Sequence, residues 1–213
     1  MMPRPREQGR ARGLIVLAGL AIIALTGLQI AGYIGGKKPL QVLGAVPAFT
    51  LIDQGGATFS SRTLEGHAWI ATFIYTTCPG PCPRVVERMK GIDAELLHDP
   101  RIRIVSFSVD PATDTPEKLA VYARDRQLDS ARWTLLTGPP DEIFTLARLG
   151  FKLGVNRAEA TDLPTTGPVV HSVHAVLVDG SGRIRGYYDT MSEDAMVKLV
   201  EDSRRLLGEA PSS

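Results

Sequence analysis

The stretch WIATFIY at residues 69–75, followed by CPGPCP at residues 78–83, decides the fold class of this chain. Residues 69–75 are almost all apolar or β-prone, which is typical of a strand buried on both faces. Behind the second stretch, Arg84–Leu97 carries its apolar residues at helical spacing and predicts a helix. A buried strand that runs through a short loop into a helix indicates an α/β protein.

Further strands and helices alternate along the rest of the domain. Strands are predicted at 48–52, 57–59, 102–109, 133–136, 174–178 and 183–188. Helices are predicted from a Thr115 cap to Gln127, over 141–149 with Gly150 behind it, and from a Ser192 cap to Leu207. We therefore expect a mixed central sheet with helices on both faces, in an order that the pattern leaves open.

The N-terminal segment has a different composition from the rest. A head with four arginines precedes Leu14–Ile34, a span without any charged residue. Its length is close to the roughly 20 residues that a membrane-crossing helix needs. The arginines would stay in the cytoplasm, so the domain would lie on the periplasmic or extracytoplasmic side. A cleaved signal peptide is the alternative, and it also exports the domain.

These segments divide the chain into five parts. We expect a basic cytoplasmic head at 1–13, a transmembrane anchor at 14–34, a linker at 35–46, one domain at 47–207 and a tail at 208–213. Lys and Arg number 24 against 23 Asp and Glu, which leaves a net charge of +1. Without a basic stripe in the domain, nucleic-acid binding has no electrostatic support.

The two cysteines of the chain, Cys78 and Cys82, lie between the buried strand and the next helix. Backbone N–H groups at a helix start stabilise a thiolate, and the prolines around both residues stiffen the loop. One turn of helix brings the two side chains close enough for a disulfide or for a shared soft metal ion. A purely structural disulfide is the third interpretation, but such a short loop would gain little stability from it.

Four histidines are candidates for a third metal ligand. His67 and His98 lie in predicted turns and are expected at the surface, and His174 lies within a predicted strand among valines. His171 ends the loop before that strand, where a side chain can be aimed at a site. Two thiolates with one imidazole suit copper, because soft sulfur selects Cu(I) and imidazole also serves Cu(II).

Four sequence blocks resemble the Sco/SenC copper proteins. The run 73–83, FIYTTCPGPCP, resembles their Cys-x3-Cys-Pro signature, and SVDP at 108–111 with DTP at 114–116 resembles a second block. WTLLTG at 133–138 and His171-Ser172 resemble two more. The blocks occur in order between about Pro47 and Leu207.

This resemblance implies a thioredoxin-like domain behind an N-terminal membrane anchor. It also implies one copper ion bound by Cys78, Cys82 and His171. The implied function is a copper metallochaperone for the binuclear copper centre in subunit II of cytochrome c oxidase or for another exported copper protein. The resemblance places Asp110 near the site, where turn initiation before Pro111 explains it equally well. It supplies no role for His174.

An enzymatic function remains as the alternative. The cysteine pair could act as the attacking and resolving thiols of an exported thiol-disulfide oxidoreductase. His171 separates the two hypotheses, because a redox pair has no need of a particular histidine.

Overall fold

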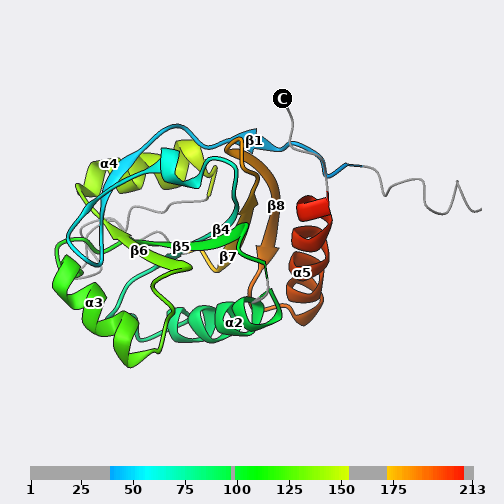
Figure 1. Ribbon diagram of the computed structural model, residues 1–213. Coiled ribbons are helices and arrows are strands. Elements are labelled where there is room, and N and C mark those ends of the chain that lie inside the picture. The colour runs from blue at the N-terminus through cyan, green and yellow to red at the C-terminus, as the bar shows by residue number, and fades with distance from the viewer. Residues whose placement is uncertain (1–38, 97–98, 154–171, 209–213) are drawn as a thin grey trace, which may run out of the picture. The chain divides into compact units, whose positions relative to one another are not determined.

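The computed structural model describes residues 39–96, 99–153 and 172–208, and all of its elements belong to the second of two units, Leu40–Ser213. An eight-stranded sheet runs through this unit in the order β1-β8-β7-β4-β5-β6-β2-β3 (Figure 1). The strands are β1 (Gly44–Ala45), β2 (Thr50–Asp53), β3 (Thr58–Ser60), β4 (Ala68–Ile74), β5 (Ile102–Ser108), β6 (Trp133–Thr137), β7 (His174–Val178) and β8 (Arg183–Asp189). The helices are α2 (Cys82–Glu95), α3 (Pro116–Asp125), α4 (Pro140–Thr145) and α5 (Glu193–Gly208).

The centre of the sheet is parallel and its flanks are antiparallel. β4, β5 and β6 run in the same direction, while β7 and β2 pair antiparallel with the two sides of this core. Every residue of β4 is buried, as a strand covered on both faces requires. The prediction of an α/β fold with a mixed sheet flanked by helices is confirmed.

Alternation along β4 separates two hydrophobic clusters. Ile70 and Ile74 face a cluster that contains both cysteines and residues of α2, α3 and α5, which we call the cysteine face. Trp69 and Phe73 face the opposite cluster, the aromatic face, which also contains Phe107 and residues of α4. Figure 1 shows α2 and α4 on opposite sides of the central strands. The period of two residues in a strand is what assigns neighbouring side chains to opposite faces.

Helix starts follow the local chemistry of the sequence. Thr115 caps α3, since its side-chain oxygen accepts a hydrogen bond from the Lys118 N–H at 3.4 Å, and Pro116 occupies the first turn. α2 begins at Cys82, slightly before the predicted start, and has no side-chain cap. Cys82 therefore belongs to the first turn of the helix.

Three short elements were not predicted. β1 lies inside the expected linker 35–46 and pairs antiparallel with β8. A 3-10 turn, η1, spans Ser61–Leu64, and a π-helical turn, η2, spans Leu146–Gly150 at the end of α4. The predicted anchor 14–34 lies outside the described residues, and among the residues that the structure does describe no helix is long and apolar enough to cross a membrane.

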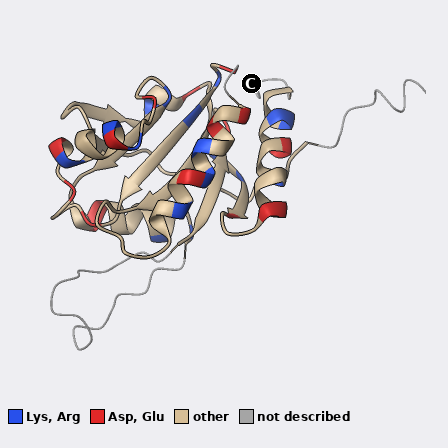
Figure 2. Cartoon of the chain, turned by 90° about the horizontal axis from the view of Figure 1, so that it is seen from below, with Lys and Arg blue, Asp and Glu red and all other residues tan. Residues whose placement is uncertain are grey.

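Charged residues of both signs are interspersed along the helices, as the view from below shows (Figure 2). Two ion pairs link α2 to α5, Arg88 with Glu193 and Glu95 with Arg204. Arg88 is partly exposed and the other three side chains are largely exposed, so these pairs contribute little to stability.

Candidate functional site

Cys78 and Cys82 lie together where β4 ends and α2 begins. The N–H of Cys78 donates to the Tyr75 carbonyl at 3.3 Å, which turns the chain directly after the strand. Cys82 opens α2, and the two thiols lie close enough to shift each other's pKa. Both cysteines are free and buried, with exposed fractions of 8% and 7%. The structure thus brings together the two thiols that the sequence identified as the site.

The two thiols have opposite protonation tendencies. Burial opposes ionisation of Cys78, but hydrogen bonds from the Cys82 thiol, from the backbone at Cys82 and Gly80 and from Tyr75 lower its pKa below the ordinary value. Burial and the hydrogen bond with Cys78 raise the pKa of Cys82 to about 12. Cys78 is therefore the thiol that ionises first, and Cys82 stays protonated at neutral pH.

Tyr75 completes the immediate surroundings of Cys78. Burial, and then its hydrogen bond with Cys78, raise the pKa of the Tyr75 hydroxyl to about 12. The hydroxyl consequently stays protonated at neutral pH and can donate to the Cys78 sulfur. Sequence reasoning counted Tyr75 only as the end of a strand.

A buried carboxylate, that of Asp114, lies behind the cysteine loop. Its oxygens accept hydrogen bonds from the backbone N–H of Thr76 at 3.0 Å, from the Thr76 hydroxyl, and from the Ser108 hydroxyl at 2.6 Å. Asp114 is 0% exposed. The sequence showed this residue within a motif but gave no sign that it is buried, because burial depends on the meeting of β4, β5 and α3.

Asp110 performs the turn role that the sequence allowed. Its carbonyl accepts from the N–H groups of Thr113 and Asp114 at 3.0 and 2.8 Å, and its own N–H donates to the Ser108 hydroxyl at 3.2 Å. Its charge also lies near Tyr75 and contributes to the raised pKa of that tyrosine.

The structure describes His174 but not His171, which lies outside the described residues. His174 is exposed and pairs across the strands with Asp189. It alternates with Val176 and Val178, which belong to the aromatic face, so its strand position is directed away from the face that holds the cysteines. Val173, by contrast, packs against the cysteine face.

The thiol pair suits a soft metal ion. Within the described residues no group of three or more Cys, His, Asp and Glu side chains could hold a metal. Two adjacent sulfurs without a neighbouring carboxylate ligand favour Cu(I) over harder ions such as Mg²⁺ or Ca²⁺.

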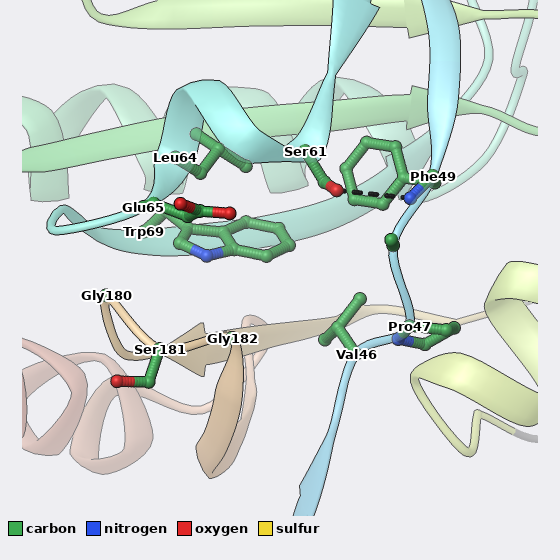
Figure 3. A pocket seen from close by; sticks show the side chains of 11 residues that line it. Val46, Pro47, Phe49, Ser61, Leu64, Glu65, Trp69, Gly180, Ser181 and Gly182 are labelled. Atoms are coloured by element: carbon green, nitrogen blue, oxygen red, sulfur yellow. Dashed lines mark hydrogen bonds between the residues drawn. The ribbon is translucent and has the colours of Figure 1, made fainter.

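A cavity lies near the opposite end of β4 (Figure 3). It measures about 140 Å³ and is lined by residues that include Pro47, Leu64, Glu65 and Trp69. Beside it the Ser61 hydroxyl accepts a hydrogen bond from the Phe49 N–H at 3.1 Å. Trp69 stands near the start of β4 whereas Cys78 follows its end, so the cavity and the cysteine pair are separate features.

Comparison with known proteins identifies the family. The SCO1/SenC family model matches residues 39–207. A SCO1 homologue of Bacillus subtilis is 32% identical over 92% of this chain and 94% of its own. A Stutzerimonas stutzeri protein whose name describes it as copper-binding is 33% identical over 67% of this chain and 68% of its own.

A solved structure supports the same family. BsSco, described as a member of the Sco family of cytochrome c oxidase assembly proteins and as containing a disulfide switch, superposes with a TM-score of 0.69. It is 28% identical, and the match covers 82% of this chain and 100% of that one. The resemblance seen in the sequence blocks is confirmed.

Proposed function

Because this chain belongs to the SCO1/SenC family, we propose that it is an exported copper-binding assembly factor that carries copper on Cys78, Cys82 and His171. Its recipient is the binuclear copper centre in subunit II of cytochrome c oxidase or another exported copper protein. The single observation that carries the proposal is the pair of free, buried thiols of Cys78 and Cys82 between the end of β4 and the first turn of α2.

The geometry of the pair supports capture and release of a Cu(I) ion. Cys78 ionises first and offers a thiolate, and Cys82 loses its proton only when a metal ion replaces it. Each binding event therefore releases protons, so the affinity falls as the pH falls. A site with few protein ligands can also exchange them with the thiols of a partner protein.

The third ligand in this proposal is His171 rather than His174. His174 begins the strand alternation that belongs to the aromatic face, which argues against it as a ligand beside the two cysteines. A neutral imidazole would complete the coordination that two thiolates begin, for Cu(I) and also for Cu(II).

Membrane attachment is part of the proposal. The uncharged span 14–34 has the length of a transmembrane helix, and the arginines before it would hold the head in the cytoplasm. Extraction of membranes with alkaline carbonate tests it: the full chain should remain in the pellet, and a chain released into the supernatant would contradict the anchor.

The deciding experiment is an anaerobic Cu(I) titration of the reduced full chain in detergent, in competition with a chromophoric Cu(I) chelator. We expect one tightly bound copper per chain, loss of saturable binding in Cys78→Ser and Cys82→Ser, and weaker binding in His171→Ala. His174→Ala is the matched control and should bind as the wild type does. Binding that is absent, or indifferent to all these changes, would refute the proposal.

A thiol-disulfide oxidoreductase is the second candidate, favoured by the unequal pKa values of the two thiols. The Cys78 thiolate would attack a substrate disulfide, and Cys82 would then release the second substrate thiol and form the Cys78–Cys82 disulfide. Two electrons pass to the substrate in that sequence. Rapid turnover of a disulfide substrate by copper-free protein, with glutathione supplied to reduce the Cys78–Cys82 disulfide again, and unchanged in His171→Ala, would favour this candidate.

A further inference from the structure

Asp114 connects three elements behind the cysteine loop. It follows β5 and directly precedes Thr115, the cap of α3, and its side chain reaches Thr76, two positions before Cys78. Within the described part of the chain, the Asp114 side chain is the only fully buried one that hydrogen-bonds to the cysteine loop.

The hydrogen bonds of Asp114 come from uncharged groups. One oxygen accepts from the Thr76 N–H and from the Ser108 hydroxyl, and the other accepts from the Thr76 hydroxyl. A buried carboxylate without these donors would carry a large desolvation cost. Two of the three bonds exist only while Thr76 keeps its present position, so burial of Asp114 and the conformation of the cysteine loop stabilise each other.

Asp114 itself is held from the other side. Its N–H donates to the Asp110 carbonyl at 2.8 Å, which closes the turn after β5. The same strand end is tied to β4, since the Val109 N–H donates to the Ile74 carbonyl at 2.9 Å. The carboxylate thus connects the end of β5, which is hydrogen-bonded to β4, with the loop that carries Cys78.

We propose that Asp114 is a positioning residue that acts through Thr76 to hold the Cys78 loop in the geometry in which the two sulfurs meet. Its effect on copper rests on the function proposed above, whereas its effect on the Cys78–Cys82 disulfide does not. Both products need the sulfurs close together, so a loosened loop weakens copper binding and also makes the disulfide easier to reduce.

The test uses Asp114→Asn, the matched pair Thr76→Val and Thr76→Ser, and the control Asp179→Asn, all in the full chain. Asn has the same shape but no charge, and one acceptor oxygen becomes an NH₂ group. The Thr76 hydroxyl then has to accept a hydrogen bond instead of donating one, and the bonds to the carboxylate charge are replaced by weaker bonds to a neutral amide. Thr76→Val removes the hydroxyl donor and Thr76→Ser retains it. Asp179→Asn breaks a buried ion pair at the far turn between β7 and β8 and controls for destabilisation alone.

Two quantities are measured: Cu(I) affinity by chelator competition, and the reduction potential of the Cys78–Cys82 disulfide in glutathione buffers. For Asp114→Asn we expect copper affinity to fall about 10–100-fold. The disulfide equilibrium should shift about tenfold toward the dithiol, which is about 30 mV for a two-electron couple. Thr76→Val should shift both quantities in the same direction by less, and Thr76→Ser and Asp179→Asn should stay within about threefold of the wild type.

The outcomes separate the two proposals. If Asp114→Asn folds and leaves the Cu(I) affinity and the disulfide reduction potential unchanged, the positioning role is overturned. It is also overturned if Asp179→Asn shifts both quantities as much as Asp114→Asn does. If Asp114→Asn does not fold, equal values for Thr76→Val and Thr76→Ser overturn it instead. A wild type that binds no Cu(I), while Asp114→Asn still shifts the potential, overturns the copper function and leaves the positioning role intact.

Discussion

Two buried aspartates, Asp114 and Asp179, stand at opposite ends of the sheet and are stabilised in different ways. Asp179, in the turn after β7, is 5% exposed and pairs with Arg183 and Arg185, each at 2.8 Å. Asp114, after β5, is 0% exposed and accepts only from hydroxyl and backbone groups among the described residues.

The two aspartates differ in whether charged groups or neutral groups donate hydrogen bonds to the carboxylate. At the far end, fixed guanidinium groups neutralise the carboxylate and tie Leu40 to the domain, since Arg185 also donates to the Leu40 carbonyl at 2.6 Å. At the cysteine end the donors to the carboxylate, among the residues that the structure describes, are the Thr76 N–H and the hydroxyls of Thr76 and Ser108, all of them neutral.

The largest expected effect on stability is that of Asp179→Asn. Removing one partner of a buried ion pair leaves the Arg185 charge buried without its carboxylate and should lower the free energy of unfolding by about 3–5 kcal/mol. Urea unfolding measures it. A decrease of less than about 1 kcal/mol in the free energy of unfolding would show that the ion pairs of Asp179 do not distinguish it energetically from Asp114.

The pH dependence of this variant checks the cause. Burial opposes ionisation of Asp179, but hydrogen bonds from the Arg183 backbone and from the Arg185 and Arg183 side chains lower its pKa below the ordinary value. Because the pKa of Asp179 is lower in the folded state, its ionised carboxylate stabilises the folded protein at pH values above the unfolded-state pKa. This stabilisation disappears as the pH falls through the folded-state pKa. The difference between wild type and Asp179→Asn should thus be full at pH 7 and shrink below about pH 4. A difference that stays constant with pH would exclude the charge as its origin.

A smaller effect is expected from Ser108→Ala at the cysteine end. The change removes one donor to Asp114 and the acceptor for the Asp110 N–H, and should cost about 1.5–3 kcal/mol. Thermal or urea unfolding measures it. If Ser108→Ala destabilised the protein more than Asp179→Asn does, the neutral donors would matter more than the ion pair.

The smallest effect is expected from Arg183→Met. The Arg183 side chain is 35% exposed, and Asp179 keeps Arg185 and its backbone donors, so the loss should be about 0–1 kcal/mol. The same unfolding measurement checks it, with 0.5 M salt added to screen the exposed pair. A loss as large as that of Asp179→Asn would mean that the half-exposed arginine, rather than Arg185, neutralises the aspartate.

Sequence reasoning worked best where the information is local. The buried strand at 69–75 became β4 (Ala68–Ile74), and the Thr115 cap opened α3, because apolar alternation and side-chain capping involve residues close in the chain. β1 was missed, since a two-residue strand exists only through its pairing with β8. In the site, the two thiols were predicted from the sequence. Asp110 rather than Asp114 was predicted to lie near them, because in the sequence Asp114 resembles an ordinary turn residue, and its burial depends on β4 and α3.

The amino-acid sequence by itself determined the alternation of strands and helices and the placement of Cys78 and Cys82 between a buried strand and a helix. Those features follow from periodicity and from prolines that restrict a few neighbouring torsion angles. Only the tertiary structure decided the strand order, the face on which His174 begins its strand, and the partners of Asp114 and Asp179. Those depend on contacts between residues far apart in the chain, whose energies no local pattern encodes.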